Sequence, residues 1–166
     1  DSSIYSKLTK EEILELEKAK QLISQITKKY DLTSQEINKI IQEDFFPVEI
    51  INEKLTVLES IVKFLKEEKN LPLSDISTLI KRDQRNVWHI YNKSNKKYPK
   101  KFVIKKVRFW IPISILSNEK LSALESIVFY LKENFSLTYH QIALLLKRDD
   151  RTIWTVYQRA RKKNVE

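Results

Sequence analysis

Residues 118–163 read NEKLSALESIVFYLKENFSLTYHQIALLLKRDDRTIWTVYQRARKK, and residues 52–97 read NEKLTVLESIVKFLKEEKNLPLSDISTLIKRDQRNVWHIYNKSNKK. A shift of 66 positions places the second segment on the first without a gap, and 23 of the 46 positions are identical. This identity is far above what unrelated segments share, so the chain contains a duplicated unit. The unit is long enough for a few short helices and too short for a large domain of its own.

Each copy predicts three short helices, because apolar residues recur at the helical period between polar breaks. The expected helix caps in the second copy are Ser117 or Asn118, Thr138, and Asp149 or Asp150. Those in the first copy are Asn52, Ser74 and Asp83. The break between the second and third helices is three or four residues, which is the length of a helix-turn-helix turn.

A fainter, partial copy precedes the two full ones. It predicts helices over about residues 10–29 and 34–42, but Phe45-Phe46-Pro47 begins where a third helix would start. Aromatic-proline segments at 45–50 and 108–116 alternate as short strands do, and their prolines restrict any sheet to a small one. Residues 94–106 are the expected linker between the full copies.

The composition excludes several classes of function. The chain has no cysteine, which removes disulfides and thiolate metal sites, and no glycine, which removes every glycine-rich phosphate loop. No apolar run approaches the roughly 18 residues of a membrane span, and the start does not resemble a signal peptide. Because the chain begins at Asp1 and contains no methionine, we expect further residues upstream in the natural protein.

The positive charge is uneven along the chain. The formal net charge is +9, made up of −3 over residues 1–50, +4 over residues 51–98 and +8 over residues 99–166. The part without a third helix is acidic and both parts with one are basic, so we expect the third helices to face a polyanion. A lysine-rich solvated surface with no partner is the alternative interpretation.

The third helices, over about residues 84–95 and 150–162, are the candidate reading surface. In a helix-turn-helix protein this helix enters the major groove of DNA, where Arg, Asn and Gln can bind base edges. The candidate base-reading residues, opposite the apolar stripe, are Arg85, Asn86, His89, Asn92, Arg151, Thr152, Thr155 and Gln158. The candidate phosphate contacts are the basic residues of the turns and helix ends: Lys81, Arg82, Lys93, Lys96, Lys97, Lys147, Arg148, Arg159, Arg161, Lys162 and Lys163.

The two copies agree at the turn and differ on the reading face. Both have Lys-Arg-Asp followed by Arg85 or Arg151, whereas Asn86, His89 and Asn92 are replaced by Thr152, Thr155 and Gln158. We interpret this as two readers of different half-sites, although drift on an unused surface would also give divergence.

Other aromatic and titratable residues have simpler interpretations. We expect Trp88 and Trp154 to be edges of the core, and Tyr91 and Tyr157 to pack inward with hydroxyl groups free to meet phosphate. The aspartates Asp83 and Asp149 are expected to be helix caps rather than metal ligands, and His140 a surface residue.

The string from Leu137 to Tyr157, LTYHQIALLLKRDDRTIWTVY, resembles the helix-turn-helix of sigma-factor region four and related three-helix DNA-binding domains. The matching residues are Ile142, Ala143, Leu146, Arg151, Thr152 and Ile153, with Ile76, Leu79, Ile80, Arg85 and Val87 following in the first copy. The whole chain also resembles small tandem helix-turn-helix proteins of archaea. The resemblance implies DNA binding and a transcriptional or nucleoid role.

Together these observations predict a mainly α protein with a helical hairpin (residues 1–44), a first helix-turn-helix unit (45–98) and a second (99–166). We expect a non-enzymatic protein that binds double-stranded DNA in adjacent major-groove segments and needs no cofactor or metal. A cytoplasmic, nucleoid-associated location follows from that expectation. An adaptor of the transcription machinery, self-association through the hairpin, and structured-RNA binding remain alternatives.

Overall fold

The computed structural model describes residues 2–165 and is mainly helical, as the sequence predicts. It divides into two compact units, residues 1–43 and residues 44–166. None of the described helices is long and apolar enough to cross a membrane.

Unit 1 is the predicted helical hairpin. Its helices are α1 (Ser2–Tyr5), α2 (Lys10–Tyr30) and α3 (Ser34–Gln42). Capping boxes start both long helices: the side chain of Thr9 accepts the Glu12 N–H, and that of Thr33 accepts the Glu36 N–H. No side chain of α2 or α3 is buried, so this unit has no core of its own.

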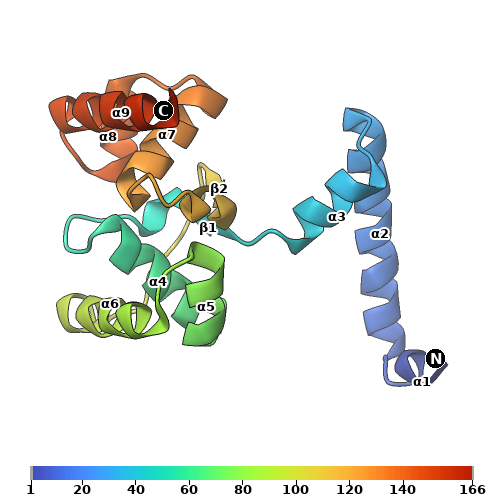
Figure 1. The fold of residues 1–166 in the computed structure, drawn as a ribbon. Helices are drawn as coiled ribbons and strands as arrows, with labels where there is room; N and C mark the ends of the chain where they lie inside the picture. Colours follow the sequence, from blue (N-terminus) through green and yellow to red (C-terminus); the bar gives the residue numbers. More distant parts are fainter. Residues whose placement is uncertain (1, 166) are drawn as a thin grey trace. The chain divides into compact units, whose positions relative to one another are not determined.

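Unit 2 contains both full repeats (Figure 1). The first repeat consists of β1 (Phe45–Pro47), the 3₁₀ helix η1 (Val48–Ile50), α4 (Val57–Glu67), α5 (Leu73–Ile80) and α6 (Gln84–Lys97). The second consists of β2 (Trp110–Pro112), η2 (Ile113–Ser117), α7 (Ala123–Phe135), α8 (Tyr139–Leu146) and α9 (Asp150–Val165). The two strands pair antiparallel, which confirms the predicted short strands.

The first helix of each repeat begins later than predicted. Its caps are Thr56 and Ser122, each in a capping box with the glutamate three residues on, and not Asn52, Ser117 or Asn118. The Asn52 side chain instead accepts the N–H groups of Lys54 and Leu55, which makes an Asx turn before the helix. An asparagine that forms such a turn gives the same sequence signal as an asparagine that caps a helix. The predicted starts of the first helices were therefore wrong by about one helical turn.

Two other boundaries differ from the predicted ones. Pro72, which has no side-chain hydrogen bond, precedes α5, so Ser74 lies inside that helix and does not cap it. Residues 94–97 belong to α6, and the linker therefore runs from Tyr98 to Phe109. Part of this linker is packed, since the Tyr98 and Phe102 rings stack with centroids 5.7 Å apart.

One hydrophobic core spans both repeats. Phe46 and Ile111 are fully buried on the paired strands, and they belong to the same cluster as Ile61 of α4 and Ile127 of α7. The repeats are therefore packed on each other, and their third helices project from a common body.

Candidate nucleic-acid interface

The turn before each third helix has the same backbone conformation in both repeats. Lys81 and Lys147 end α5 and α8 in the left-handed region, with φ of 49° and 53°. Glycine usually occupies such a position because it has no Cβ to clash, and this chain has no glycine. The turns of three residues, 81–83 and 147–149, confirm the predicted spacing between the second and third helices.

An aspartate starts each third helix, as predicted. Asp83 accepts the N–H groups of Arg85 and Asn86 at 2.9 and 3.2 Å, and Asp149 accepts the N–H of Thr152 at 2.8 Å. The hydroxyl and N–H of Thr152 lower the pKa of Asp149, because both hydrogen bonds favour the carboxylate. Each cap holds the following arginine in the first turn of the helix.

The first-repeat reading candidates lie on the open side of α6. Val87 and Ser94 are buried against the body, while Arg85, Asn86 and His89 are exposed. Asn92 is half-buried and donates its amide to the Trp88 carbonyl at 3.0 Å. Asn86, Trp88, His89, Ile90, Asn92, Lys93 and Lys96 line a shallow hollow along this helix.

The second-repeat candidates are more constrained. Arg151 is exposed, but Thr152, Thr155 and Gln158 are half-buried. The Thr152 hydroxyl donates to Asp149 at 2.7 Å and the Thr155 hydroxyl donates to the Arg151 carbonyl at 2.9 Å. The two threonines can still accept a hydrogen bond, so Arg151 and Gln158 are the candidates with free donors.

Trp88 and Trp154 were expected at the edge of the core, and that prediction was wrong. Each has 52% of its surface exposed, at equivalent positions three residues after Arg85 and Arg151. Residues three apart lie on the same side of a helix, so in each repeat the arginine and the tryptophan belong to the same exposed face. The identity of both residues between the copies was the signal that could have identified them as part of the surface.

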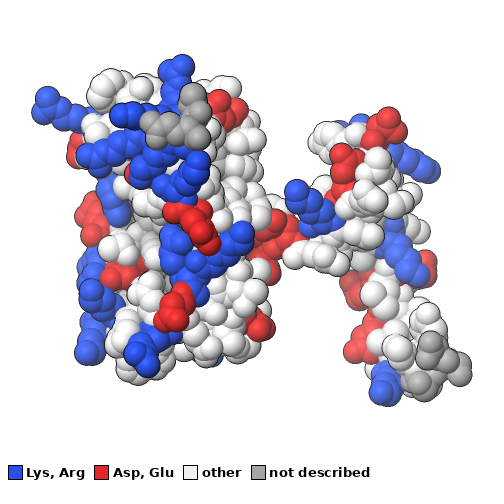
Figure 2. Space-filling view, in the orientation of Figure 1, with Lys and Arg blue, Asp and Glu red and all other residues white. Residues whose placement is uncertain are grey.

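Most of the predicted phosphate contacts are exposed: Lys81, Lys93, Lys96, Lys147, Arg159, Arg161 and Lys162. Arg82 is half-buried. Lys and Arg side chains gather over α6 and α9 in the view of Figure 2. Exposed cations thus lie in the turn before each third helix and along the helix itself, next to the reading candidates in sequence.

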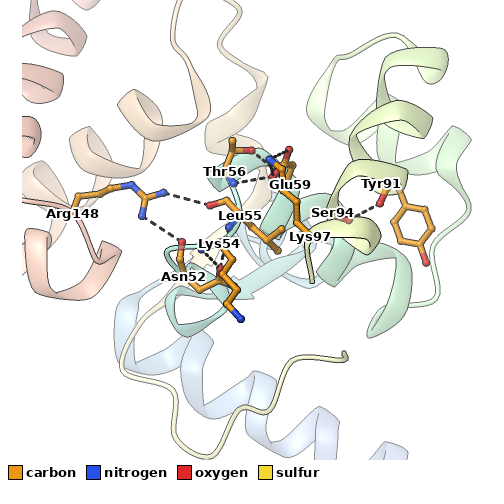
Figure 3. A network of polar contacts seen from close by, with 9 residues as sticks. All are labelled: Asn52, Lys54, Leu55, Thr56, Glu59, Tyr91, Ser94, Lys97 and Arg148. Atoms are coloured by element: carbon orange, nitrogen blue, oxygen red, sulfur yellow. Dashed lines mark hydrogen bonds and ion pairs between the residues drawn. The ribbon is translucent and has the colours of Figure 1, made fainter. Parts of the chain in front are cut away.

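Three of the predicted phosphate contacts are held within the protein. Lys97 binds the buried carboxylate of Glu59 at 2.9 Å, and at the equivalent place Lys163 binds Glu125 at 2.8 Å. Arg148 donates to the carbonyls of Asn52 and Leu55 in the other repeat, at 3.4 and 3.5 Å (Figure 3). These side chains stabilise the fold, so we remove them from the set of phosphate ligands.

The tyrosines of the third helices are also engaged. The Tyr91 hydroxyl donates to Glu67 and the Tyr157 hydroxyl donates to Glu133. The prediction that these hydroxyl groups are free to meet phosphate was therefore wrong. The hydrogen bond to Glu133 raises the pKa of Tyr157. His140 is exposed as predicted, with its Nδ1 3.0 Å from Asp150.

Among residues 2–165 there is no cluster of three His, Asp or Glu side chains placed to hold a metal ion. Comparisons with protein-family models, with curated proteins and with solved structures found no match.

Proposed function

We propose that this chain binds double-stranded DNA through the open faces of α6 and α9, without catalysis, as a transcription regulator or nucleoid-organising protein. The observation that carries the proposal is the matched pair of surfaces: both repeats leave an arginine and a tryptophan open at equivalent positions of the third helix. Arg85 and Arg151 lie in the first turn of their helices, the part of a recognition helix that meets base edges. Guanine is the base that an arginine binds with two hydrogen bonds.

The contacts of the basic residues support the same assignment. Glu59 of α4 and Glu125 of α7 pair with Lys97 and Lys163 at the inner side of the third helices. Seven other lysines and arginines of the turns and third helices remain exposed: Lys81, Lys93, Lys96, Lys147, Arg159, Arg161 and Lys162. Cations that are solvated in the free protein can release counterions from DNA on binding, which makes the affinity depend steeply on salt.

An adaptor that binds proteins through its aromatic arms is less well supported. That function requires exposed aromatic side chains and third-helix arginines occupied by ion pairs. Of the four arm aromatics, Phe46 is fully buried and Phe45 and Phe109 are half-buried, and Trp110 is exposed at 51%. The ion pairs found within residues 2–165 do not include Arg85 or Arg151.

The test is a fluorescence-anisotropy titration of duplex DNA at two salt concentrations with wild type and the double variant Arg85→Ala/Arg151→Ala. We expect each arginine to contribute about 1–3 kcal/mol if it reads a base, and the affinity of wild type to fall steeply with salt. The control is Lys28→Ala/Lys39→Ala, which removes the same formal charge from unit 1 and should bind as wild type does. Equal loss in both variants, or stronger competition by duplex RNA than by DNA, would refute groove reading.

A further inference from the structure

The two strands pair in a way that relates the repeats by a two-fold axis. Residues 45–47 and 110–112 are equivalent, because each strand ends in the proline that precedes a 3₁₀ helix. In the antiparallel register Phe46 lies opposite its own equivalent, Ile111. On either side of this pair, Phe45 lies opposite Pro112 and Pro47 lies opposite Trp110, so the first residue of each strand faces the last residue of the other. Repeats related by translation would place these strands parallel to each other, whereas the strands are antiparallel.

Hydrogen bonds just outside the strands have the same symmetry. The Val48 N–H donates to the Phe109 carbonyl at 3.0 Å, and the Ile113 N–H donates to the Asp44 carbonyl at 2.8 Å. Val48 and Ile113 are equivalent residues, and so are Asp44 and Phe109, counted back from the two prolines. Each bond is therefore the two-fold mate of the other.

The helices repeat the pattern on a larger scale. Helix α5 packs on η2 of the other repeat, and its equivalent α8 packs on η1. Helix α4 packs against its own equivalent, α7. In Figure 1, α6 lies below the strand pair and α9 above it. The contacts are those of an isologous dimer, here formed inside one chain.

We propose that the DNA site of this protein consists of two half-sites in inverted orientation, which rests on the proposed function above. A duplex has two-fold axes perpendicular to its own axis, and recognition helices related by a protein two-fold meet the two half-sites in opposite senses. A tandem repeat in sequence would suggest direct half-sites, whereas the register of β1 and β2 assigns inverted ones.

The two half-sites have different sequences with one position in common. Arg85 and Arg151 are the same residue in both readers, and the remaining candidates differ: Asn86 against Thr152, His89 against Thr155, and Asn92 against Gln158. The site is thus an imperfect palindrome, with a shared guanine contact in each arm.

The experiment selects duplexes from a random library with the full chain, then compares synthetic duplexes carrying the enriched half-sites inverted or direct at equal spacing. We expect the inverted arrangement to bind about tenfold or more tightly, since a direct arrangement leaves one reader out of register. Tighter binding of the direct arrangement, or equal binding of both, overturns the inverted site while the proposed function stands. A folded chain that enriches no duplex overturns both.

A variant with matched readers gives a second measurement. Asn86→Thr/His89→Thr/Asn92→Gln changes only side chains on the open face of α6 to those of α9. We expect this variant to select a true palindrome built from the half-site of the second repeat. Selection of two direct copies of that half-site would contradict the two-fold arrangement.

Discussion

Arg82 and Arg148 occupy the same position in the two turns. Only Arg148 forms hydrogen bonds with the opposite repeat. Its guanidinium donates to the carbonyls of Leu146 and Lys147 and, across the repeats, to those of Asn52 and Leu55. No hydrogen bond or ion pair of the Arg82 side chain is found within residues 2–165. The symmetry of the body is therefore broken at this residue.

The pair offers a matched test of that difference. Arg148→Ala should lower the free energy of unfolding by about 1–2 kcal/mol, because it leaves carbonyl groups at the contact without their donor. Arg82→Ala should stay within about 0.5 kcal/mol of wild type, because the half-buried Arg82 side chain has no such hydrogen bonds to lose. Urea denaturation measures both, and equal effects would contradict a structural role for Arg148 alone.

The left-handed lysines of the turns make a different residue-scale prediction. A side chain with a Cβ in this conformation costs about 1–2 kcal/mol, and glycine removes that term at a backbone-entropy cost of about 0.5–1 kcal/mol. Lys81→Gly/Lys147→Gly should therefore raise the free energy of unfolding by about 1 kcal/mol in total and weaken duplex binding. A variant that unfolds more easily than wild type would show that the lysine side chains support the turn.

At the scale of elements, one glutamate joins the first and third helices of each repeat. Glu59 accepts the Thr56 N–H at the start of α4 and binds Lys97 at the end of α6 (Figure 3). Burial opposes the charge of this carboxyl, but the hydrogen bonds from Lys97 and Thr56 outweigh it and lower the pKa of Glu59.

Because the pKa of Glu59 is lower in the folded state than in the unfolded chain, its carboxylate stabilises the fold at pH values above the unfolded pKa. This stabilisation is lost as the pH falls through the folded pKa. Glu59→Gln should thus lower the free energy of unfolding by about 1–2 kcal/mol at pH 7. The difference from wild type should shrink as the pH falls below about 4. Thermal unfolding across pH 3–7 tests this, with Glu68→Gln, an exposed neighbour, as the control.

The helices could be predicted from the sequence because their signals are local. The hairpin of α2 and α3, the caps Asp83 and Asp149 and the short turns all follow from the spacing of apolar and capping residues. The partners of Lys97 and Arg148 lie 38 and 93 or more residues away in sequence, so no local pattern reveals that these cations are occupied. The strand pairing is non-local for the same reason.

At the scale of the whole molecule, the shared core predicts that the two repeats unfold together. Phe46 is fully buried opposite Ile111 at the two-fold axis and belongs to the cluster that includes α4 and α7 residues. A Phe→Ala change in such a core typically costs about 3–5 kcal/mol. The repeats contact each other through the strand pair and through α5 on η2 and α8 on η1. The loss of stability should therefore affect both repeats.

Hydrogen exchange of Phe46→Ala and wild type, read by mass spectrometry, separates cooperative repeats from independent ones. We expect peptides from α4 and from α7 to lose protection by similar factors, since opening either repeat exposes the same core. The peptides of α2 should exchange as in wild type, because α2 belongs to unit 1 and Phe46 to unit 2. Protection lost in α4 and retained in α7 would mean that the repeats are separate folding units, and the two-fold body would then be too weak to fix the relative orientation of α6 and α9.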